Sequence, residues 1–531
     1  MKRALINTHL SLGRRDLFRA ATYAAAASFV GSTVAAPAAR LPTRGNGPDV
    51  YRRIGVEPFI NLTSARTMNG GSLLLPEVAD AIHESSFYHV NLQELLLEAC
   101  PRIADLLGVP GAMVGSGAAG AMTIATLACM TGGNIESLQQ LPNTEGIKDE
   151  VVAVRQTRSI YDHAIRMTGA KMIDVSTPDD LAGAFGPQTF MAFAGQRIQE
   201  ADSKIPLEKF AEAAHAHGVP VLIDAANALP LNPDPFLECG ADLVAYSGGK
   251  SLKGPQSAGL LLGRKDLTDA AYVASAPHHT FARPMKVSKE EIVGALAAVE
   301  YLMTKRNIQE EHEQYKVWYR HISDSITQVT GVRTTIIESP RGSSHPEMRV
   351  EWNIDKIGLV AREIGEQLLN GTPRIMSLAF PKELNPTSME TNNFVIRPMA
   401  MHPEDYKIVA ERLQEVFKNA PGAKPKPVLK PPAGSLDGHW EVEIAFVADT
   451  ALHTMYLQNR GSQITGLHRG RIAQGKVEGE IDGDRVYFES RGKYEAAPMQ
   501  YFFKGELSGD EMGGELGLGE YGKATWKARR V

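Results

Sequence analysis

The chain has 531 residues, of which 43% are hydrophobic and 22% charged, and its formal net charge is -5. This length exceeds that of one ordinary domain and allows a large buried core. The balanced charge excludes a global electrostatic footprint for nucleic acid, and three scattered cysteines exclude a disulfide framework or a cysteine metal site. We therefore expect a multidomain protein with no nucleic-acid partner and no metal.

The first 39 residues have the features of an export signal. Arg14 and Arg15 form a twin-arginine pair, which an alanine-rich apolar run and a stretch of small residues follow. The apolar run is too short for a permanent transmembrane helix, which requires about 20 residues. A chance basic start before a short apolar helix is the alternative. The segment resembles Tat signals, which export folded proteins. It predicts a bacterial periplasmic protein that is cleaved near Ala38 or Ala39 and has no stable membrane anchor.

Between residues 51 and 330, apolar runs alternate with amphipathic segments. Helices are predicted from Pro76 and over 94–107, where Pro101 would kink the helix or split it in two. Alternation of this type predicts an α/β fold with a large, mostly parallel sheet and helices on both faces. The predicted strands lie at 59–63, 151–154, 171–175, 189–193, 219–223, 241–247 and 259–263.

A glycine-rich turn at residues 114–121 opens an apolar helical run. Free backbone N–H groups and the positive end of the helix dipole at such a turn favour a phosphate. Small residues also serve close helix packing, so the pattern by itself is weak evidence. The candidate phosphate ligands are Ser116, Gly117, Ala118 and Ala119.

The stretch 221–263 brings a carboxylate and an amine to the ends of two predicted strands. One apolar run ends at Asp224, and a second ends at Ser247, which two glycines and Lys250 follow. Pyridoxal phosphate requires a lysine amine for covalent attachment, a carboxylate for its ring nitrogen and donors for its phosphate. Asp224 and Lys250 would meet the first two needs. An ordinary α/β strand pair with polar residues at its loop ends is the alternative.

The sequence Ser-Gly-Gly-Lys-Ser-Leu-Lys-Gly-Pro-Gln-Ser-Ala-Gly at 247–259 resembles the lysine motif of the SelA-like branch of fold-type I pyridoxal-phosphate enzymes. L-seryl-tRNA(Sec) selenium transferases and D-glucosaminate-6-phosphate ammonia-lyases belong to that branch. The likeness extends over about residues 51–417, which is most of the chain. It implies that Lys250 is the Schiff-base lysine and that Asp224 is the partner of the pyridinium nitrogen.

The resemblance also assigns residues to the rest of the cofactor. The phosphate would lie at the turn 116–119, to which Ser247 would add a hydroxyl. Either Tyr161 or His163 would cover the face of the pyridine ring. The alternative for each of these two is a surface position on the helix that follows.

Three cations are candidates for binding the anionic groups of the substrate. In the selenium transferases, the loop that matches residues 277–286 carries two arginines that bind an anionic group, and their positions correspond to Arg283 and Lys286. Lysine keeps the charge but lacks the bidentate fork of arginine. Many fold-type I enzymes bind the substrate carboxylate with an arginine of the small domain, and Arg397 is the candidate here. Solvated surface cations and a structural salt bridge are the alternatives.

Departures from the family pattern disfavour selenium transfer. The selenium transferases have an arginine where this chain has Ser72, and an aspartate where it has Gly249. They also carry an N-terminal tRNA-binding domain, for which the export signal leaves no room. The Gly-Gly-Lys form of the lysine motif is closer to the ammonia-lyases.

The composition changes in the C-terminal part of the chain. We expect the large cofactor-binding domain, with an N-terminal arm, at 40–320 and a small α+β domain at 321–420. A proline-rich linker at 421–435 precedes short alternating segments at 436–531, which predict a β-barrel or sandwich. An Asp-Gly pair within this domain marks a hairpin turn. The domain contains no cluster with an obvious catalytic role.

These features predict a pyridoxal-phosphate-dependent lyase that acts on a small molecule, an amino acid or amino-sugar acid. It would remove the Cα proton, eliminate a β-substituent and release ammonia and a 2-oxo acid. Transamination, racemisation, aldol cleavage or a selenium-transferase-like group transfer are alternatives on the same apparatus. A binding protein with an inactive fold is the alternative of another class. Fold-type I enzymes usually build their sites at a dimer interface, so we expect a homodimer or a higher homo-oligomer.

Overall fold

The computed structural model describes residues 49–531 except for 201, 339–344, 378–390 and 424–427. The predicted export signal lies outside the described residues, and so does part of the predicted linker. No helix in the described part of the chain is long and apolar enough to cross a bilayer.

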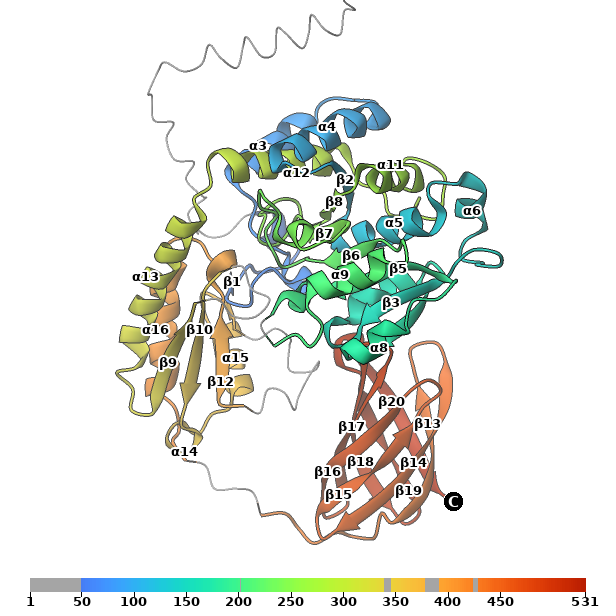
Figure 1. The fold of residues 1–531 in the computed structure, drawn as a ribbon. Helices are drawn as coiled ribbons and strands as arrows, with labels where there is room; N and C mark the ends of the chain where they lie inside the picture. Colours follow the sequence, from blue (N-terminus) through green and yellow to red (C-terminus); the bar gives the residue numbers. More distant parts are fainter. Residues whose placement is uncertain (1–48, 201, 339–344, 378–390, 424–427) are drawn as a thin grey trace, which may run out of the picture. The chain divides into compact units, whose positions relative to one another are not determined.

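A seven-stranded sheet forms the centre of the large domain (Figure 1), with the strand order β2-β8-β7-β6-β5-β3-β4. Parallel pairs join β4, β3, β5, β6 and β7, whereas β8 is antiparallel to both β2 and β7. β5, β7 and β8 are wholly buried, and β2, β3 and β6 are buried at all but one residue, as is typical of parallel strands that are covered on both faces. The predicted mostly parallel sheet is confirmed, but β2 was not among the predicted strands and the predicted strand at 59–63 lies outside this sheet. The strands are β2 (Gly111–Ser116), β3 (Glu150–Val154), β4 (Lys171–Val175), β5 (Thr189–Gly195), β6 (Val221–Asp224), β7 (Leu243–Ser247) and β8 (Ala258–Gly263).

The longest helices of the large domain pack on this sheet or on one another. The apolar helix α5 lies against β2, β8, β7, β6 and β5, and most of its residues are buried. Helix α4 runs unbroken through Pro101, so it is not split in two. Pro101 lies on the exposed side of α4, where water reaches the carbonyl that loses its N–H partner. The helices are α2 (Asp49–Arg52), α3 (Pro76–Ser85), α4 (Leu92–Leu107), α5 (Gly117–Thr131), α6 (Ile135–Gln140), α7 (His163–Arg166), α8 (Pro178–Ala182), α9 (Leu207–His215), α10 (Pro235–Glu238), α11 (Lys265–Ala274) and α12 (Lys289–Thr304).

The small domain has its own hydrophobic core, built around a three-stranded antiparallel sheet of order β12-β10-β9. A two-residue strand of the N-terminal arm, β1, pairs in parallel with β11. Ile60 and Leu62 of this arm are fully buried in the small-domain core. The elements are β1 (Ile60–Asn61), α13 (Ile308–Ile326), β9 (Val332–Ile337), β10 (Glu347–Trp352), α14 (Ile354–Ile357), α15 (Ala361–Leu369), β11 (Ile375–Met376), β12 (Asn393–Ile396) and α16 (Asp405–Lys418).

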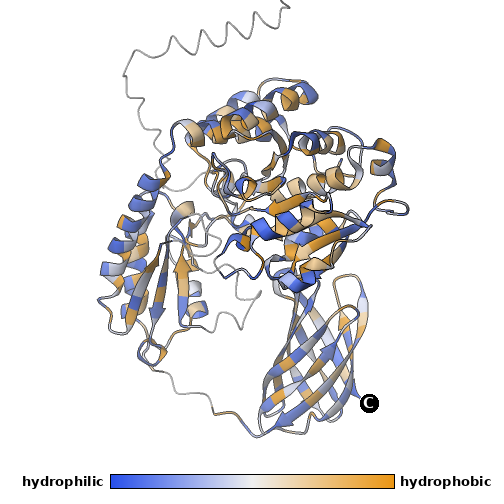
Figure 2. Ribbon diagram, viewed as in Figure 1, coloured by the Kyte–Doolittle hydropathy of each residue, from blue (hydrophilic) through white to orange (hydrophobic). Residues whose placement is uncertain are grey.

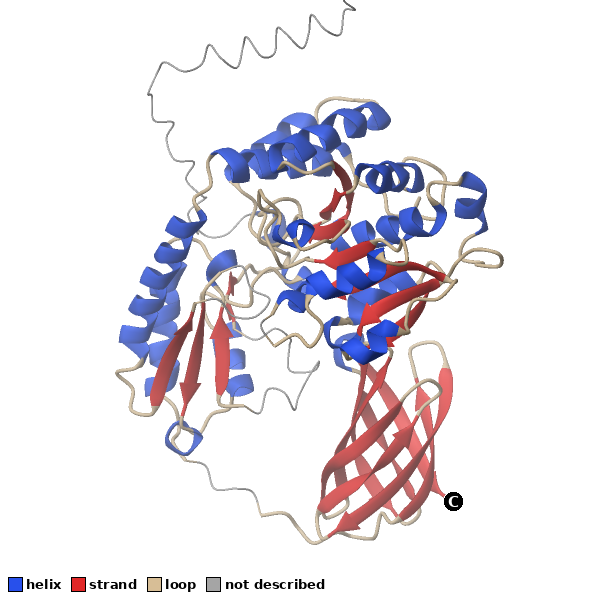
Figure 3. Cartoon of the chain, viewed as in Figure 1, coloured by secondary structure: helices blue, strands red, loops and turns tan. Residues whose placement is uncertain are grey.

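The C-terminal part is an all-strand barrel (Figure 3). Its eight antiparallel strands follow one another in chain order and close on themselves. Buried and exposed residues alternate along its strands, and Figure 2 shows the matching alternation of hydropathy. Pairing of β13 with β20 closes the barrel, which confirms the barrel rather than the sandwich. Gly483, with φ 65°, lies in the tight turn between β16 and β17. The strands are β13 (Gly438–Ala445), β14 (Thr450–Arg460), β15 (Gln463–Arg469), β16 (Gln474–Asp482), β17 (Arg485–Tyr494), β18 (Ala497–Ser508), β19 (Glu511–Gly517) and β20 (Lys523–Arg530).

Candidate functional site

The predicted site residues come from strand ends at one edge of the large sheet. β6 and β7 are parallel, and β2 runs in the same direction because β8 is antiparallel to both β2 and β7. Ser116, Asp224 and Ser247 are the last residues of β2, β6 and β7, and Lys250 lies in the turn after β7. Ligands of open α/β sheets bind at this edge, outside the carboxyl ends of the strands.

Two glycines let the turn before Lys250 fold tightly against β8. A Cβ on Gly248 would lie 2.7 Å from the carbonyl oxygen of Ala258, and one on Gly249 would lie 2.3 Å from the Cα of Gln256. The N–H of Gly248 also donates to the carbonyl of Ala258 at 2.8 Å. The backbone of the protein itself therefore requires these glycines, whatever the cofactor requires.

Asp224 and Lys250 perturb each other's protonation. Burial raises the pKa of the Asp224 carboxyl, which the N–H of Ala226 and the charge of Lys250 partly oppose. Burial lowers the pKa of the Lys250 ammonium; the charge of Asp224 raises it and the charge of Arg66 lowers it. A neutral amine is the form that bonds to a carbonyl cofactor. A cationic ring nitrogen beside Asp224 would favour the charged carboxylate.

The start of α5 is open to an anion. Gly117 has φ 64°, which bends the chain sharply between β2 and the helix. The side chain of Ser116, at the position before the helix, makes no capping hydrogen bond to it. Ala118 and Ala119 stand in the first turn, where N–H groups and the helix dipole favour a phosphate.

Tyr161 faces the lysine. The centre of its ring lies 5.9 Å from the Nζ of Lys250. The other candidate for the ring face, His163, is an exposed residue at the start of α7. Because β3 is parallel to β5 and hence to β6 and β7, the segment that carries Tyr161 leaves β3 at the same edge of the sheet.

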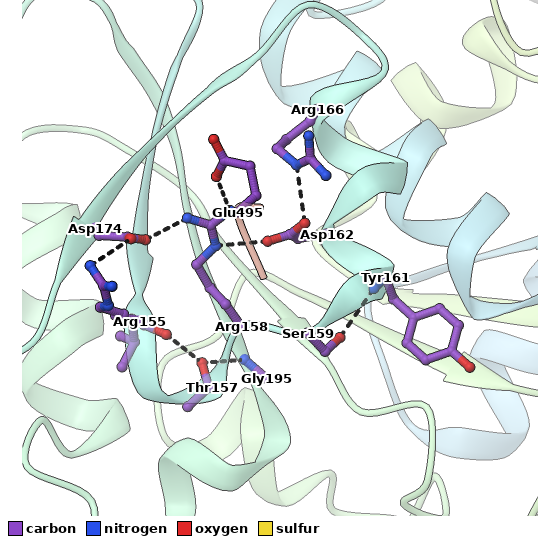
Figure 4. Close-up of polar contacts among 11 residues, drawn as sticks. Arg155, Thr157, Arg158, Ser159, Tyr161, Asp162, Arg166, Asp174, Gly195 and Glu495 are labelled. Carbon is purple, nitrogen blue, oxygen red and sulfur yellow. Dashed lines mark hydrogen bonds and ion pairs between the residues drawn. The ribbon is translucent and has the colours of Figure 1, made fainter. Parts of the chain in front are cut away.

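A buried arginine orders the segment before Tyr161 (Figure 4). Arg158 donates from Nε to Asp162 and from Nη1 to Asp174, both at 2.7 Å. Its Nη2 pairs with Glu495 at 2.6 Å. The side chain of Arg158 is 5% exposed and that of Asp162 is fully buried. This network fixes the backbone on both sides of Tyr161.

The predicted anion-binding cations fall into two groups. Arg397 follows β12, and its Nε donates to Glu347 at 2.7 Å. The structural salt bridge considered as an alternative is therefore present. Arg283 and Lys286 lie in the loop between α11 and α12. In the described part of the chain, neither side chain forms a hydrogen bond or ion pair with Lys250, Asp224 or Arg397.

The sequence did not reveal Arg66, which contributes charge to the site. The positive charge of Arg66 disfavours the protonated form of Lys250. The pKa of Arg66 is itself lowered, mainly by burial and then by the charge of Arg397. Nearby, the N–H of Ser72 donates to the carbonyl of Gly249 at 3.0 Å. In the sequence, only the position of Arg66 before the glycine turn at 69–72 could have indicated that this residue belongs to the site.

A second network, which the sequence did not predict, supports residues 248–253, the turn that carries Lys250 and that we call the lysine turn. Glu311 accepts from Arg306 at 3.0 and 2.9 Å and from Lys253 at 3.3 Å. Arg306 also donates to the carbonyl of Ser251 at 2.6 Å. Lys253 has φ 58°, a left-handed conformation that costs energy in a residue with a side chain. The ion pairs stabilise this strained turn next to Lys250.

The residues present fit pyridoxal phosphate. Lys250, Asp224 and the first turn of α5 supply the amine, the carboxylate and the phosphate donors at one sheet edge. The hydroxyl of Ser72 is buried beside the lysine turn and has no hydrogen-bond partner among the described residues. Such an orphaned polar group is expected where a bound molecule supplies the partner.

Comparisons with known proteins agree with this assignment. The family model for "Aminotransferase class-V" matches residues 203–344. A 5'-C-glycyluridine monooxygenase-decarboxylase from Streptomyces sp is 27% identical over 385 residues, 70% of this chain and 93% of that protein. D-glucosaminate-6-phosphate ammonia lyase from Salmonella typhimurium is 24% identical over 384 residues, 70% of this chain and 99% of that protein.

Selenium transferases and a solved structure complete the comparison. L-seryl-tRNA(Sec) selenium transferase from Serratia proteamaculans is 25% identical over 339 residues, 58% of this chain and 69% of that protein. The solved structure of D-glucosaminate-6-phosphate ammonia-lyase has a TM-score of 0.58 and 23% identity, covering 70% of this chain and 99% of that chain. The fold is thus that of fold-type I pyridoxal-phosphate enzymes. The predicted resemblance to the SelA-like branch is confirmed. These relatives imply pyridoxal 5'-phosphate as the cofactor, and they support an enzyme that depends on it.

Proposed function

We propose that this protein is a pyridoxal-phosphate-dependent lyase that acts on an amino acid or amino-sugar acid. The reaction removes the Cα proton, expels a β-substituent such as hydroxyl, and releases ammonia and a 2-oxo acid. The observation that carries the proposal is the placement of Asp224 and Lys250 at one sheet edge, with the ring of Tyr161 facing the lysine. The likeness to an ammonia lyase over 99% of that protein's length supports the reaction type.

Each residue has a role that follows from its position. When bound, pyridoxal phosphate supplies an electron sink for the negative charge that develops at the substrate Cα. Asp224 stabilises a positive ring nitrogen, because an opposite charge nearby favours the cationic form. Lys250 holds the cofactor and then takes the Cα proton, a task for which its lowered pKa suits it. Ser116 to Ala119 and Ser247 bind the phosphate, and Tyr161 covers the ring face.

Decarboxylation is the second candidate. It rests on the 27% identity to a monooxygenase-decarboxylase that is matched over 93% of its length. The two reactions break different bonds at Cα, so their products separate them. Release of carbon dioxide without ammonia would favour this second reaction.

We also propose a homodimer, in which Arg283 and Lys286 reach the site of a second copy. Both residues are at least partly exposed, and within the described chain their side chains do not bond to the site residues named above. Light scattering of the purified protein would report its mass. If the protein is a monomer at the concentration used in the activity assays, the proposed dimer is wrong and Arg283 and Lys286 do not bind substrate in this way.

The test begins with absorbance spectra of the purified protein, of Lys250→Ala and of Lys265→Ala. Lys265 pairs with Asp269 on the surface and serves as the matched control. We expect a visible band of lysine-bound cofactor in the wild type and the control, and none in Lys250→Ala. D- and L-amino acids and amino-sugar acids are then screened for 2-oxo acid and ammonia. A wild type without the band after addition of pyridoxal phosphate would refute the proposed function.

A further inference from the structure

The N-terminal arm connects the small-domain core to the lysine turn. At one end, the N–H of Arg397 donates to the carbonyl of Leu62 at 2.9 Å, and Thr63 bridges to Arg397 in parallel. At the other end, Ser72 bonds to Gly249, and the N–H of Leu75 donates to the carbonyl of Lys253 at 3.3 Å. Arg66 lies between these two attachments, so its backbone is tied to both halves of the site.

The turn that presents Arg66 is fixed by its own hydrogen bonds. The Oδ1 of Asn61 accepts from the N–H and the hydroxyl of Thr63 at 2.9 and 2.8 Å. The amide of Asn69 donates to the hydroxyl of Thr63 at 2.8 Å, and Ser64 adopts φ 72°. The carbonyl of Arg66 accepts from the N–H groups of Asn69 and Gly71 at 2.9 and 3.0 Å. A preorganised turn of this kind holds a binding residue in place before the ligand arrives.

The charges around Arg66 favour an anion. Its Nε atom is buried, and its pKa is lowered first by burial and then by the charge of Arg397. Two guanidinium groups that repel each other in a partly buried site are stabilised by an anion that both can reach. Glu347 bonds to the Nε of Arg397. An incoming carboxylate would add a further negative charge beside the two arginines and Lys250.

We propose that Arg66 and Arg397 together bind the carboxylate of the substrate, so that Arg66 is a second substrate-binding arginine and the enzyme requires a free carboxyl group. This inference rests on the proposed function, and it names the substrate feature that the site recognises. Arginine suits the task because its planar fork matches a carboxylate with two hydrogen bonds.

The pair of Arg66 and Arg397 also affects which bond at Cα breaks. Loss of carbon dioxide removes the negative charge from the carboxylate, so two arginines that stabilise the charged group oppose this loss. Loss of the Cα proton leaves the carboxylate charged and bound. The arginine pair therefore favours deprotonation over decarboxylation.

The test measures binding of an unreactive carboxylate, propionate, with propionamide as its uncharged counterpart. Ligand-observed NMR titrations compare the wild type, Arg66→Gln, Arg397→Gln, the double variant and Arg102→Gln, a surface control that pairs with Glu300. We expect each single variant at the site to weaken propionate binding about 10-fold to 100-fold, the range of a charge-assisted hydrogen bond. The double variant should weaken propionate binding by less than the product of the two single-variant fold-changes, because both arginines contact the same carboxylate.

Several outcomes separate this inference from the proposed function. Propionate affinity in Arg66→Gln equal to that in Arg102→Gln would overturn the inference, provided that both variants retain the melting temperature of the wild type. Arg66→Lys keeps the charge without the fork and should recover part of the affinity. Equal binding of propionamide and propionate by the wild type would also overturn it. The absence of a lysine-bound cofactor band refutes the lyase but leaves the propionate result to stand by itself.

Discussion

Replacement of Glu311 by alanine should destabilise the lysine turn. The carboxylate neutralises Arg306 and Lys253, whose side chains are 6% and 16% exposed, and is itself 25% exposed. Removing one partner of a buried ion pair costs about 3–5 kcal/mol because a charge is left buried without compensation. The partial exposure of Glu311 places the expected cost near about 3 kcal/mol, and for a domain of this size that lowers the melting temperature by about 5–10 °C.

Scanning calorimetry of Glu311→Ala beside Glu310→Ala measures this effect. Glu310 is the exposed neighbour on α13, and its replacement should change stability by less than about 0.5 kcal/mol. Burial alone would raise the pKa of Glu311, but Arg306 and Lys253 lower it below its usual value. The contribution of Glu311 should therefore be present above the pKa of an unfolded glutamate and disappear as the pH falls through the lowered pKa. If the two variants melt together at pH 7, Glu311 does not compensate the two cations.

Three further predictions concern the cofactor site and the barrel. Asp224→Asn should keep the cofactor band but lose turnover by about 10-fold to 100-fold, the range of one charge-assisted hydrogen bond; a wild-type rate would contradict its role beside the ring nitrogen. Tyr161→Phe should bind pyridoxal phosphate as the wild type does, whereas Tyr161→Ala should weaken binding by about 0.5–1.5 kcal/mol through loss of the ring contact; equilibrium dialysis gives both constants. In the barrel, burial and then the charge of His453 lower the pKa of His468 to about 3, and His453 bonds to His468 at 2.9 Å. Between about pH 6.5 and this value the unfolded chain binds more protons than the folded barrel. The stability of the barrel should therefore decrease as the pH is lowered through that window. His468→Gln should flatten this dependence and His439→Gln, on the exposed face of β13, should not; equal slopes in the two variants would show that His468 does not titrate as described.

The sequence by itself determined the central part of the site. Apolar runs that end at Asp224 and Ser247 identify buried strands, and parallel strands bring their carboxyl ends to one edge of the sheet. The placement of Asp224, Lys250 and the turn after β2 at that edge follows from this local pattern. The alternating segments of the C-terminal part likewise predicted a barrel or a sandwich, because alternation reports which face of a strand is buried.

Tertiary structure alone decided the residues that surround this centre. Arg66 reaches the site because a two-residue strand, β1, pairs with β11 more than 300 positions later, and so short a strand has almost no signal of its own. Arg306 and Glu311 meet Lys253 through the packing of α13 against the lysine turn, which no spacing in the sequence encodes. Closure of the barrel depends on pairing between its first and last strands. Local patterns state which side of an element is buried, whereas these contacts depend on which distant element buries it.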